Sequence, residues 1–278
     1  MSQVWFITGA GRGIGAHIAR AALQAGHRVV ATGRKLAPLR EAYADVAPES
    51  IALVELDVAS EAQAEQAVQT AVERFGRIDV LVNNAGYGQL GYFEEISADA
   101  IERQFATNVF GLMHVLRATL PVMRRQRAGH VFNLSSIGGA LGFEGSSVYC
   151  ASKFAVEGLS ASVALEVARF GIKVTVVEPG FFRTDFLDNS SIRYGDRAPD
   201  GYGDAGPSRD IYEGYNHRQA GDPAKLGAAL VQLAGMAAPP KQFLAGSDAL
   251  AIVGEALQGR LDEMRTFADL SRSTDGVF

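Results

Sequence analysis

Residues 4–15, Val4-Trp5-Phe6-Ile7-Thr8-Gly9-Ala10-Gly11-Arg12-Gly13-Ile14-Gly15, open the chain with an apolar run, a glycine-rich turn and the start of a helix. Glycine lets the backbone turn tightly and come close to a phosphate group. A helix N-terminus favours the negative charge of such a group. The helix that follows carries Ile14, Ile18 and Ala22 on one face and meets a stop signal at Gly26. The stretch therefore predicts a strand, a phosphate-binding turn and a helix, in that order.

Short apolar runs alternate with helical patterns along the rest of the chain. The runs are continuous, as expected for strands covered on both faces, and alternation with helices is typical of a parallel sheet. The sequence predicts an α/β fold: one domain over residues 1–278, doubly wound around a parallel sheet of about seven strands, with a C-terminal helical extension at 248–278. The predicted strands are Val4–Thr8, Arg28–Thr32, Ile51–Leu56, Ile78–Val82, His130–Ser135, Lys173–Glu178 and Gln242–Ala245. Helices are predicted over Glu61–Phe75, Ile101–Gln126, Cys150–Phe170, Pro223–Ala237 and Asp248 to about Leu270.

The composition indicates an ordinary globular protein. Hydrophobic residues make up 47% of the 278 residues, which is enough for a large core, and the net charge is −5. The densest basic cluster, Arg124-Arg125 with Arg127, is expected to be a solvated helix end, so no nucleic-acid partner is predicted. The five histidines are scattered without the spacing of zinc ligands, so no metal site is predicted.

Cysteine usage and the N-terminal residues indicate the compartment of the protein. Cys150 is the single cysteine, so no intrachain disulfide can form, and a lone thiol fits a reducing cytosol. The N-terminus, Met1-Ser2-Gln3, has no basic region of the kind that opens a signal peptide. The apolar segment Leu226–Pro240 is too short and too interrupted to span a membrane. The expectation is a cytoplasmic protein without a membrane partner.

Tyr149 and Lys153 are candidates for proton chemistry. Side chains four apart on a helix share a face, and an ammonium beside a phenol is expected to lower the pKa of the phenol below its usual value of about 10. Ser136 lies thirteen residues before Tyr149, where the run His130–Ser135 ends. Ligands of open parallel sheets bind outside the carboxyl ends of the strands. Ser135 is the alternative candidate, and the thirteen-residue interval favours Ser136.

Together these residues resemble the short-chain dehydrogenase/reductase family. The resemblance rests on Thr8-Gly9-x-x-x-Gly13-x-Gly15, Asn83-Asn84-Ala85-Gly86, Ser136, Tyr149-x-x-x-Lys153 and Pro179-Gly180, and it covers about residues 1–185 strongly. It implies a Rossmann fold that binds a nicotinamide dinucleotide. Arg12 stands where the extended branch of the family, which includes sugar epimerases, needs glycine, so that branch is disfavoured.

The resemblance also implies roles for individual side chains. Tyr149 would exchange the proton with the substrate oxygen, Ser136 would hydrogen-bond that oxygen, Lys153 would lower the pKa of Tyr149 and hold the nicotinamide ribose, and Asn108 would support Lys153 through a water. Two placed donors would stabilise the charge that hydride transfer builds on oxygen. The residues expected to bind the cofactor are Gly9, Gly11, Arg12, Gly13, Ile14, Gly15, Arg34, Asp57, Val58, Asn84, Ala85, Gly86, Tyr149, Lys153, Pro179, Gly180 and Thr184.

The second predicted strand indicates which dinucleotide is bound. An NAD site usually has an acidic residue there for the ribose 2′-hydroxyl, but this chain has Gly33 followed by Arg34. Arginine can clamp a 2′-phosphate that a carboxylate would repel, and Arg12 adds a second basic residue. NADP(H) is therefore the expected cofactor. By resemblance, Asp57 would meet the adenine amino group and Thr184 the nicotinamide carboxamide.

The expected reaction interconverts an alcohol and a moderately apolar ketone or aldehyde. Phe143, Phe181, Phe182 and Phe186 lie near the pocket positions of the family, and Phe143, Phe181 and Phe186 are predicted to bind substrate with Ser136 and Tyr149. The segment 186–220, rich in glycine and proline, is expected to be a substrate loop that acts as a lid. Two alternatives stay open: a 3-oxoacyl thioester reductase of fatty-acid type, and a non-catalytic NADP-sensing protein.

Assembly is predicted from two helices. Ile101–Gln126 and Cys150–Phe170 resemble the helices of the four-helix dimer contact in this family, so a homodimer is expected. A tetramer stays open, although the charged C-terminal helix, with Arg260 and Glu263, is expected to block the strand pairing that builds the family's tetramer.

Overall fold

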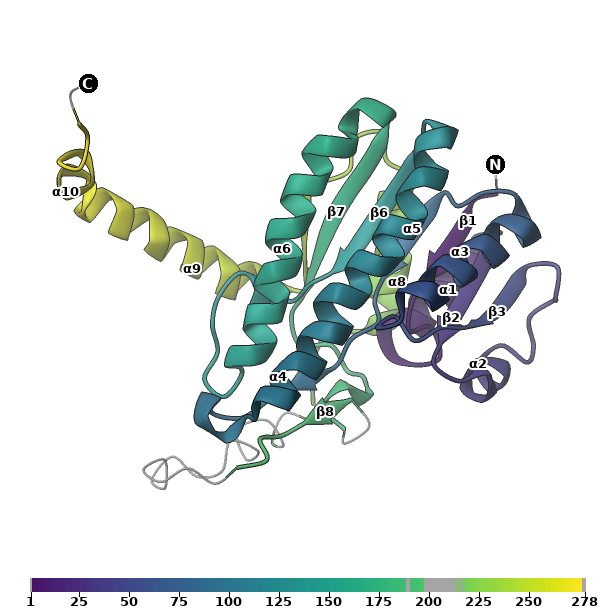
Figure 1. Cartoon of the computed structure of the whole chain (residues 1–278), viewed down its shortest axis with the longest axis horizontal. Coiled ribbons are helices and arrows are strands. Elements are labelled where there is room, and N and C mark those ends of the chain that lie inside the picture. The colour runs from purple at the N-terminus through teal and green to yellow at the C-terminus, as the bar shows by residue number, and fades with distance from the viewer. Residues whose placement is uncertain (1, 189–190, 198–213, 215, 217, 277–278) are drawn as a thin grey trace.

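A computed structural model describes residues 2–188, 191–197, 214, 216 and 218–276. Seven parallel strands form one sheet in the order β3-β2-β1-β4-β6-β7-β9, so the predicted doubly wound α/β fold is confirmed (Figure 1). The order reverses between β1 and β4, which places a crevice at the carboxyl ends of these strands. The strand bounds are β1 Val4–Ile7, β2 Arg28–Gly33, β3 Ile51–Glu55, β4 Val80–Asn83, β6 Gly129–Leu134, β7 Ile172–Pro179 and β9 Gln242–Ala245.

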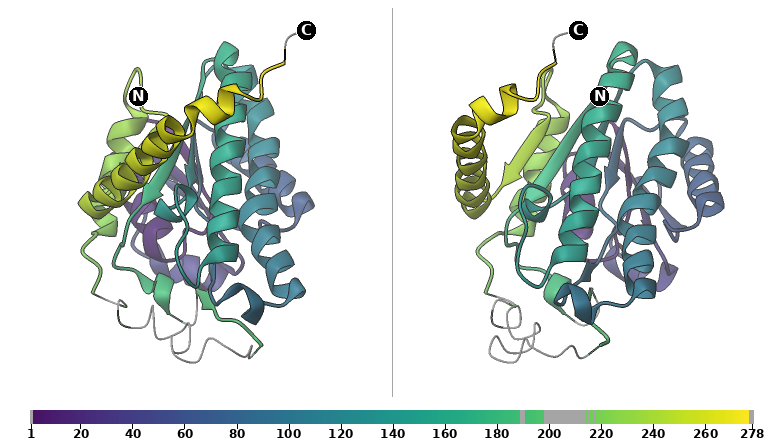
Figure 2. Two further views of the ribbon diagram at one scale, coloured as in Figure 1. Left: turned by 90° about the vertical axis from the view of Figure 1, so that its left-hand side faces the viewer. Right: turned by 60° about the vertical axis from the view of Figure 1, so that its left-hand side comes forward.

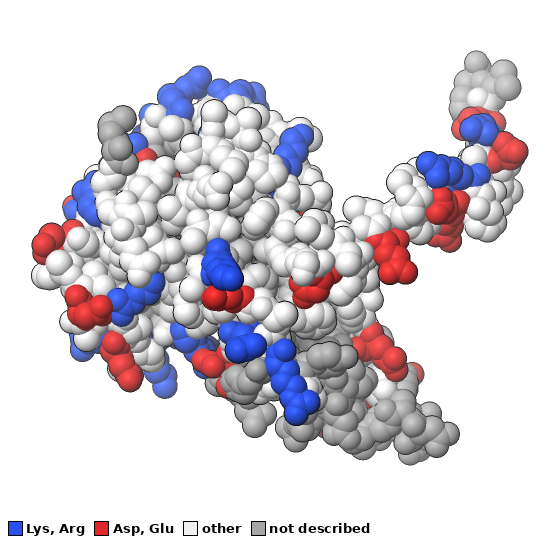
Figure 3. All heavy atoms as spheres, turned by 180° about the vertical axis from the view of Figure 1, so that it is seen from behind, with Lys and Arg blue, Asp and Glu red and all other residues white. Residues whose placement is uncertain are grey.

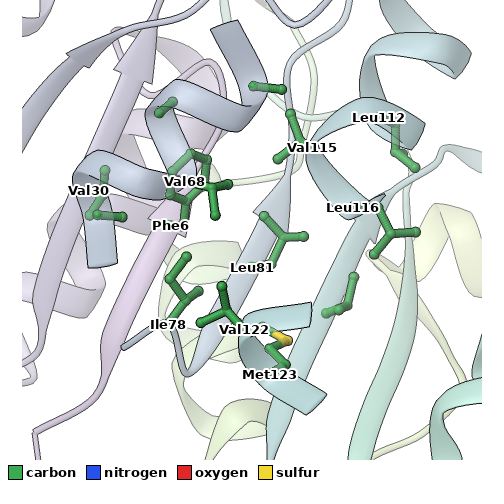
Figure 4. Close-up of a cluster of buried hydrophobic side chains, with 14 of the residues drawn as sticks. Phe6, Val30, Val68, Ile78, Leu81, Leu112, Val115, Leu116, Val122 and Met123 are labelled. Atoms are coloured by element: carbon green, nitrogen blue, oxygen red, sulfur yellow. The ribbon is translucent and has the colours of Figure 1, made fainter. Parts of the chain in front are cut away.

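Helices cover both faces of the sheet (Figure 2). On one face the core contains side chains of α3, α5 and α6, and it includes Phe6, Leu81 and Val115 from the strands and from α5 (Figure 4). On the other face Trp5 and Phe132 pack against α1 and α8. The helix bounds are α1 Gly13–Gln24, α2 Leu36–Ala42, α3 Glu61–Phe75, α4 Ala98–Phe105, α5 Gly111–Gln126, α6 Ser147–Val167, α8 Pro223–Ala234, α9 Ser247–Thr266 and α10 Ala268–Arg272.

The bounds of α3 agree with the prediction because both ends carry local stop signals. The Ser60 hydroxyl accepts a hydrogen bond from the backbone N–H of Gln63 at the N-terminus. Gly76 ends the helix in the left-handed conformation, with φ of 78°. Signals of this kind lie within a few residues of the helix end, so they can be recognised in the sequence alone.

Two predicted helices are interrupted in the structure. The segment predicted as one helix over Ile101–Gln126 contains a π-helical turn at Ala106–Phe110 between α4 and α5. The C-terminal helix breaks at Phe267, between α9 and α10. Two further elements were not predicted: α2, and a small parallel pair formed by β5, Gly88–Gln89, with β8, Ile192–Arg193. Two-residue strands carry no periodic signal, because they depend on contacts between distant segments.

The C-terminal extension projects away from the body of the protein as an arm (Figures 1 and 3). Its first turns are anchored by Ala249 and Val253, which are buried beside Ile137. Further along, Leu257, Leu261 and Met264 are largely exposed. Within the described ranges, no helix is both long and apolar enough to cross a membrane.

His130 in β6 predicts a specific acid sensitivity of the fold. Its ring is buried, its Nε2 lies 2.9 Å from Thr175 Oγ1, and burial lowers its pKa to about 3, helped by Lys173. In the unfolded chain, where the histidine pKa is about 6.5, this side chain takes up a proton below that pH, whereas in the folded protein it stays neutral. The free energy of unfolding therefore does not suffer from this group above about pH 6.5, and it decreases as the pH falls toward 3, by at most about 1.4 kcal/mol per pH unit.

We expect the free energy of unfolding of His130→Gln, measured by urea denaturation, to decrease less than that of the parent protein between pH 6.5 and pH 4.5. The matched control is His17→Gln, because His17 is exposed on α1. An unchanged pH slope in the His130 variant, relative to the parent protein, would contradict this account.

Candidate active site

The turn between β1 and α1 leaves space for a ligand because its glycines have no side chains. Gly9 and Gly13 adopt positive φ angles of 66° and 54°, a region that favours glycine. A Cβ on Gly15 would stand 2.4 Å from Gly9 O and 2.4 Å from Asn84 Nδ2. The turn runs into the N-terminus of α1, whose first residues are Gly13, Ile14 and Gly15 and which has no acidic residue in its first turn. This is the geometry of an anion-binding turn.

Asn84 ties this turn to the end of β4. Its Nδ2 donates to Thr8 O at 2.9 Å and to Gly9 O at 3.1 Å. The Thr8 hydroxyl in return accepts from the backbone N–H groups of Asn84 and Ala85. A Cβ on Gly9 would meet Ala85 Cα at 3.0 Å, so both segments must pack without side chains between them. The two motifs therefore build one rigid wall of the crevice.

Tyr149 and Ser136 face each other across Gly138. A Cβ on Gly138 would stand 3.5 Å from the Tyr149 ring and 3.6 Å from Ser136 Oγ. A hydrogen bond from Ser136 favours the ionised phenol, but burial dominates and raises the pKa of Tyr149 to about 12. Ser135 points elsewhere, toward Glu157 and Gly139. Of the two candidate serines, the structure brings Ser136 to Tyr149.

Lys153 lies one turn further along α6 and is buried. Its Nζ donates to Leu134 O at 2.8 Å and lies 5.7 Å from the centroid of the Tyr149 ring. Burial lowers the pKa of Lys153 to about 8. The sequence predicted that this ammonium lowers the pKa of Tyr149; here the ammonium donates to a carbonyl, and burial is the largest effect on the pKa of Tyr149 and raises it.

Asn108 sits in the π-helical turn and is buried. Its Oδ1 accepts from Tyr87 N at 3.1 Å, and its Nδ2 donates to Tyr87 O at 2.9 Å. A Cβ on Gly86 would stand 3.1 Å from Asn108 Oδ1, so this glycine makes room for the amide. The extra residue of a π turn is a frequent feature of functional sites. Here it aims Asn108 at the segment after β4.

The remaining predicted cofactor residues lie around the same edge of the sheet. Arg34 is exposed just after β2, while Asp57, which follows β3, is partly buried. The side chain of Val58 packs against Gly111 at the start of α5. Arg12 donates to Ser191 Oγ at 2.9 Å, which links the glycine turn to the segment after β7.

Pro179 ends β7, and the segment that follows returns to the glycine turn. Gly180 N donates to Ala245 O, and Asp248 occupies the space where a side chain on Gly180 would stand. Thr184 is the nearest neighbour of Gly13, at 3.9 Å from the point where its Cβ would stand. The structure thus brings Thr184 to the site.

The predicted pocket aromatics separate into two groups. The Phe186 ring lies 5.8 Å from the Tyr149 ring, measured between centroids, so it can form a wall of the reaction site. Phe143 and Phe181 pack instead in the hydrophobic cluster of Ile137, Ala249 and Val253, below the arm. Much of the predicted substrate loop 186–220 lies outside the described residues.

Two buried polar side chains of the site were not identified from the sequence. Ser152 Oγ donates to Tyr149 O at 2.7 Å and accepts a weak bond from Asn108 Nδ2 at 3.4 Å. Gln104 is fully buried, accepts from Gln89 N and donates to Tyr87 O. Both lie on apolar helix faces. A polar residue at such a position is the sequence signal that could have identified them. Over the same described ranges, no three potential ligand side chains gather as a metal site would require.

Fold and site together define a doubly wound α/β protein with its polar crevice at the carboxyl ends of the strands. A family model described as short chain dehydrogenase matches residues 3–194, and the chain belongs to this family. It is 39% identical over 258 residues to "Oxidoreductase BOA17" of Botryotinia fuckeliana, covering 93% of this chain and 94% of the relative. It is 36% identical over 267 residues to "3-ketodihydrosphingosine reductase" of Bacteroides thetaiotaomicron, covering 96% of each.

Solved structures show the same architecture. A short-chain dehydrogenase from Streptomyces avermitilis superposes with a TM-score of 0.90 at 36% identity and covers 99% of both chains. The structure titled ElxO with NADP bound has a TM-score of 0.72 at 28% identity, covering 87% of this chain and 96% of its own. A serine dehydrogenase complexed with NADP+ has a TM-score of 0.75 at 28% identity, with 87% and 93% covered.

Proposed function

We propose that this protein is an NADP(H)-dependent oxidoreductase that interconverts a moderately apolar ketone or aldehyde and its alcohol. The observation that carries the proposal is the meeting of Tyr149 and Ser136 beside Lys153, at the end of the crevice that begins at the glycine turn. The glycine turn fits a dinucleotide, because a side chain at Gly15 would fill it.

The protein's own groups would bind, orient and exchange a proton. The nicotinamide cofactor, when bound, supplies or accepts the hydride. Tyr149 donates its phenolic proton to the carbonyl oxygen during reduction, and Ser136 hydrogen-bonds the same oxygen as negative charge develops there. With a pKa of about 12, Tyr149 holds its proton throughout the neutral range, which suits reduction. Lys153 would hold the nicotinamide ribose, with Asn108 supporting it.

The preference for NADP(H) is supported by Arg34 and by two relatives of known structure. The exposed Arg34 follows β2, whose last residue is Gly33 and not an acidic residue. Both ElxO and the serine dehydrogenase are titled with an NADP cofactor bound. Arg12, beside Ser191, is the second basic residue proposed to meet the phosphate.

We expect Arg34→Asp to lower kcat/KM with NADPH by about 10- to 100-fold, because charge-assisted hydrogen bonds contribute about 1.5–3 kcal/mol and the new carboxylate repels a phosphate. The use of NADH should change little. Arg40→Asp is the matched control, since Arg40 is also exposed and lies on α2. A parent protein that uses NADH as well as NADPH would contradict the cofactor assignment.

The substrate class is supported by Phe186, whose ring supplies an apolar wall beside Tyr149. The relative from Bacteroides thetaiotaomicron is named for the reduction of a keto compound, which favours a ketone here. A 3-oxoacyl thioester reductase remains the enzymatic alternative, and a panel of ketones with one 3-oxoacyl thioester separates the two. An NADP-sensing role would show cofactor binding without turnover. We also propose a cytoplasmic location, which fits the single cysteine.

A homodimer is proposed through the outer faces of α5 and α6. A groove of about 780 Å³ lies between them, with an apolar floor that includes Leu120 and Val163. Phe110, which lines the groove, is 50% exposed, and Leu165, elsewhere on the surface of α6, is 76% exposed. Val156, Val163 and Val167 pack into the sheet-side core, so the exposed stripe that begins with Phe154 is the face offered to a partner.

We expect light scattering to give about twice the 29.5 kDa chain mass. Leu165→Glu should produce monomers, because it places a charge in an apolar interface, whereas Leu257→Glu on the arm is the control and should stay dimeric. A monomeric parent protein would reject the interface. A tetramer would reject the proposed blocking role of the C-terminal helix.

A further inference from the structure

The short helix α2 lies against the glycine turn, and the function proposed above gives its buried side no role. Leu39 of this helix is buried. Its side chain would meet a Cβ on Gly11 at 3.7 Å and a Cβ on Gly33 at 3.7 Å, so it packs against both the turn and the end of β2. Arg34 stands between β2 and α2. The position of α2 therefore fixes how the glycine turn lies relative to Arg34.

Tyr43, the residue after α2, reaches from the end of this helix to the glycine turn. Its side chain is buried, and its hydroxyl donates to Ala10 O at 2.6 Å. Ala10 is fully buried as well, and its N–H donates to Thr32 O at 2.9 Å. Both backbone polar groups of Ala10 are thus held, one by β2 and one by Tyr43. Burial raises the pKa of Tyr43, so the hydroxyl keeps its proton and stays a donor.

The hydrogen bond to Ala10 O sets the orientation of one peptide group of the turn. The carbonyl of Ala10 and the N–H of Gly11 belong to a planar trans peptide and point in opposite directions. Holding the carbonyl toward Tyr43 therefore turns the Gly11 N–H away from α2. A buried carbonyl that loses its partner favours any conformation that pairs it again. Without the Tyr43 hydroxyl, the turn is expected to relax away from its present shape.

Arg20 of α1 holds the Tyr43 ring in place. Its guanidinium carbon lies 5.4 Å from the centroid of that ring, and the guanidinium also donates to Ala42 O. Its two terminal nitrogens lie 2.8 Å and 2.7 Å from the two carboxylate oxygens of Asp45. Both partners of this ion pair are solvent-exposed, so the charges themselves contribute little stability. The helix that begins at the glycine turn thus contacts the residue that supports the turn from behind.

We propose that Tyr43 is a positioning residue for the nicotinamide cofactor, whose hydroxyl holds the Ala10 peptide, and with it the glycine turn, in the conformation that receives the dinucleotide. The inference rests on the proposed function, since it requires a dinucleotide in this crevice. A turn held in its binding conformation before the ligand arrives raises affinity, because less ordering is left to binding. Tyr43 acts through Ala10, so it should serve NADPH and NADH alike, in contrast to Arg34.

The test is calorimetric titration of Tyr43→Phe with NADPH and, separately, with NADH. The variant keeps the ring beside Arg20 and loses only the hydroxyl. Kd should rise about 3- to 10-fold, by a similar factor for both cofactors, which corresponds to the loss of one hydrogen bond. At saturating NADPH, kcat for ketone reduction should stay within about twofold of the parent. Hydrogen exchange of the protein without cofactor should become faster at the Ala10 N–H. Tyr92→Phe, at another buried tyrosine, is the matched control and should leave both Kd values unchanged.

Arg20→Met is a second variant, in case Tyr43→Phe does not fold. It removes the guanidinium beside the Tyr43 ring and should also raise both Kd values by a common factor. A rise of less than threefold in the Tyr43 variant would overturn the inference, and so would a loss confined to NADPH, because the hydroxyl would then act on the 2′-phosphate. A parent protein that binds neither cofactor would reject the proposed function together with the inference. Binding of both cofactors without turnover of any ketone or aldehyde would reject the proposed function alone.

Discussion

Tyr149→Phe is expected to lower kcat for carbonyl reduction by about 10³-fold or more. The variant keeps the aromatic ring against Phe186 but removes the hydroxyl that meets Ser136. General acid catalysis contributes about 10²- to 10⁴-fold, and the same hydroxyl is one of two donors to the developing oxyanion, so the upper part of this range is expected. The measurement is steady-state kinetics with NADPH and the best ketone of a panel.

The controls for this variant isolate the hydroxyl group. NADPH binding, followed by titration of cofactor fluorescence, should change by less than about threefold, because the phenol is proposed to contact the substrate oxygen. Tyr92→Phe is the matched control, since Tyr92 is a buried tyrosine whose hydroxyl lies 3.4 Å from Glu144 Oε1. Activity of the Tyr149 variant within tenfold of the parent would refute its role as proton donor.

Gly15→Ala is expected to abolish cofactor binding, with an increase in Kd of at least about 100-fold. The added Cβ would stand 2.4 Å from Gly9 O and from Asn84 Nδ2, so the turn must open or the amide must leave Thr8. Overpacking of this kind costs about 1–3 kcal/mol of stability. The change also displaces the N–H groups that would face a phosphate. Calorimetric titration with NADPH measures the loss of binding.

Gly254→Ala is the matched control for this change. Gly254 also lies within a helix, α9, but nothing stands within 4 Å of the point where its Cβ would be. Removing a glycine from an exposed helix interior stabilises by up to about 1 kcal/mol. The control should therefore bind NADPH as the parent does and unfold at a slightly higher temperature. A Gly15 variant that binds NADPH normally would show that the turn does not hold the cofactor.

The fold could be predicted because its signals are local. Each strand of the sheet is a continuous apolar run, and helix ends such as Ser60 and Gly76 carry their own stop signals. The π-helical turn at Asn108 could not be predicted, because it depends on hydrogen bonds between this side chain and the backbone of Tyr87, in the loop after β4. The pair β5 and β8 is equally dependent on contacts between distant segments.

The sequence predicted which residues come together in the site, but it did not predict how buried each of them is. The spacing of Tyr149 and Lys153 on one helix identified the pair, but the pKa of Tyr149 depends on its burial, which no spacing reveals. Phe181 was predicted to bind substrate. The structure places it in the cluster below the arm, because α9 packs there, and the position of α9 could not be predicted from the sequence.

Hydride transfer itself is the most direct test of the proposed function. Purified protein is incubated with NADPH carrying deuterium at the transferable position and with a panel of apolar ketones, and the alcohols are analysed by mass spectrometry. The account predicts one deuterium on the carbinol carbon of at least one product, formed by the parent protein and lost in Tyr149→Phe. Binding of NADPH with no labelled alcohol from any ketone or aldehyde would contradict it and would favour a cofactor-sensing role.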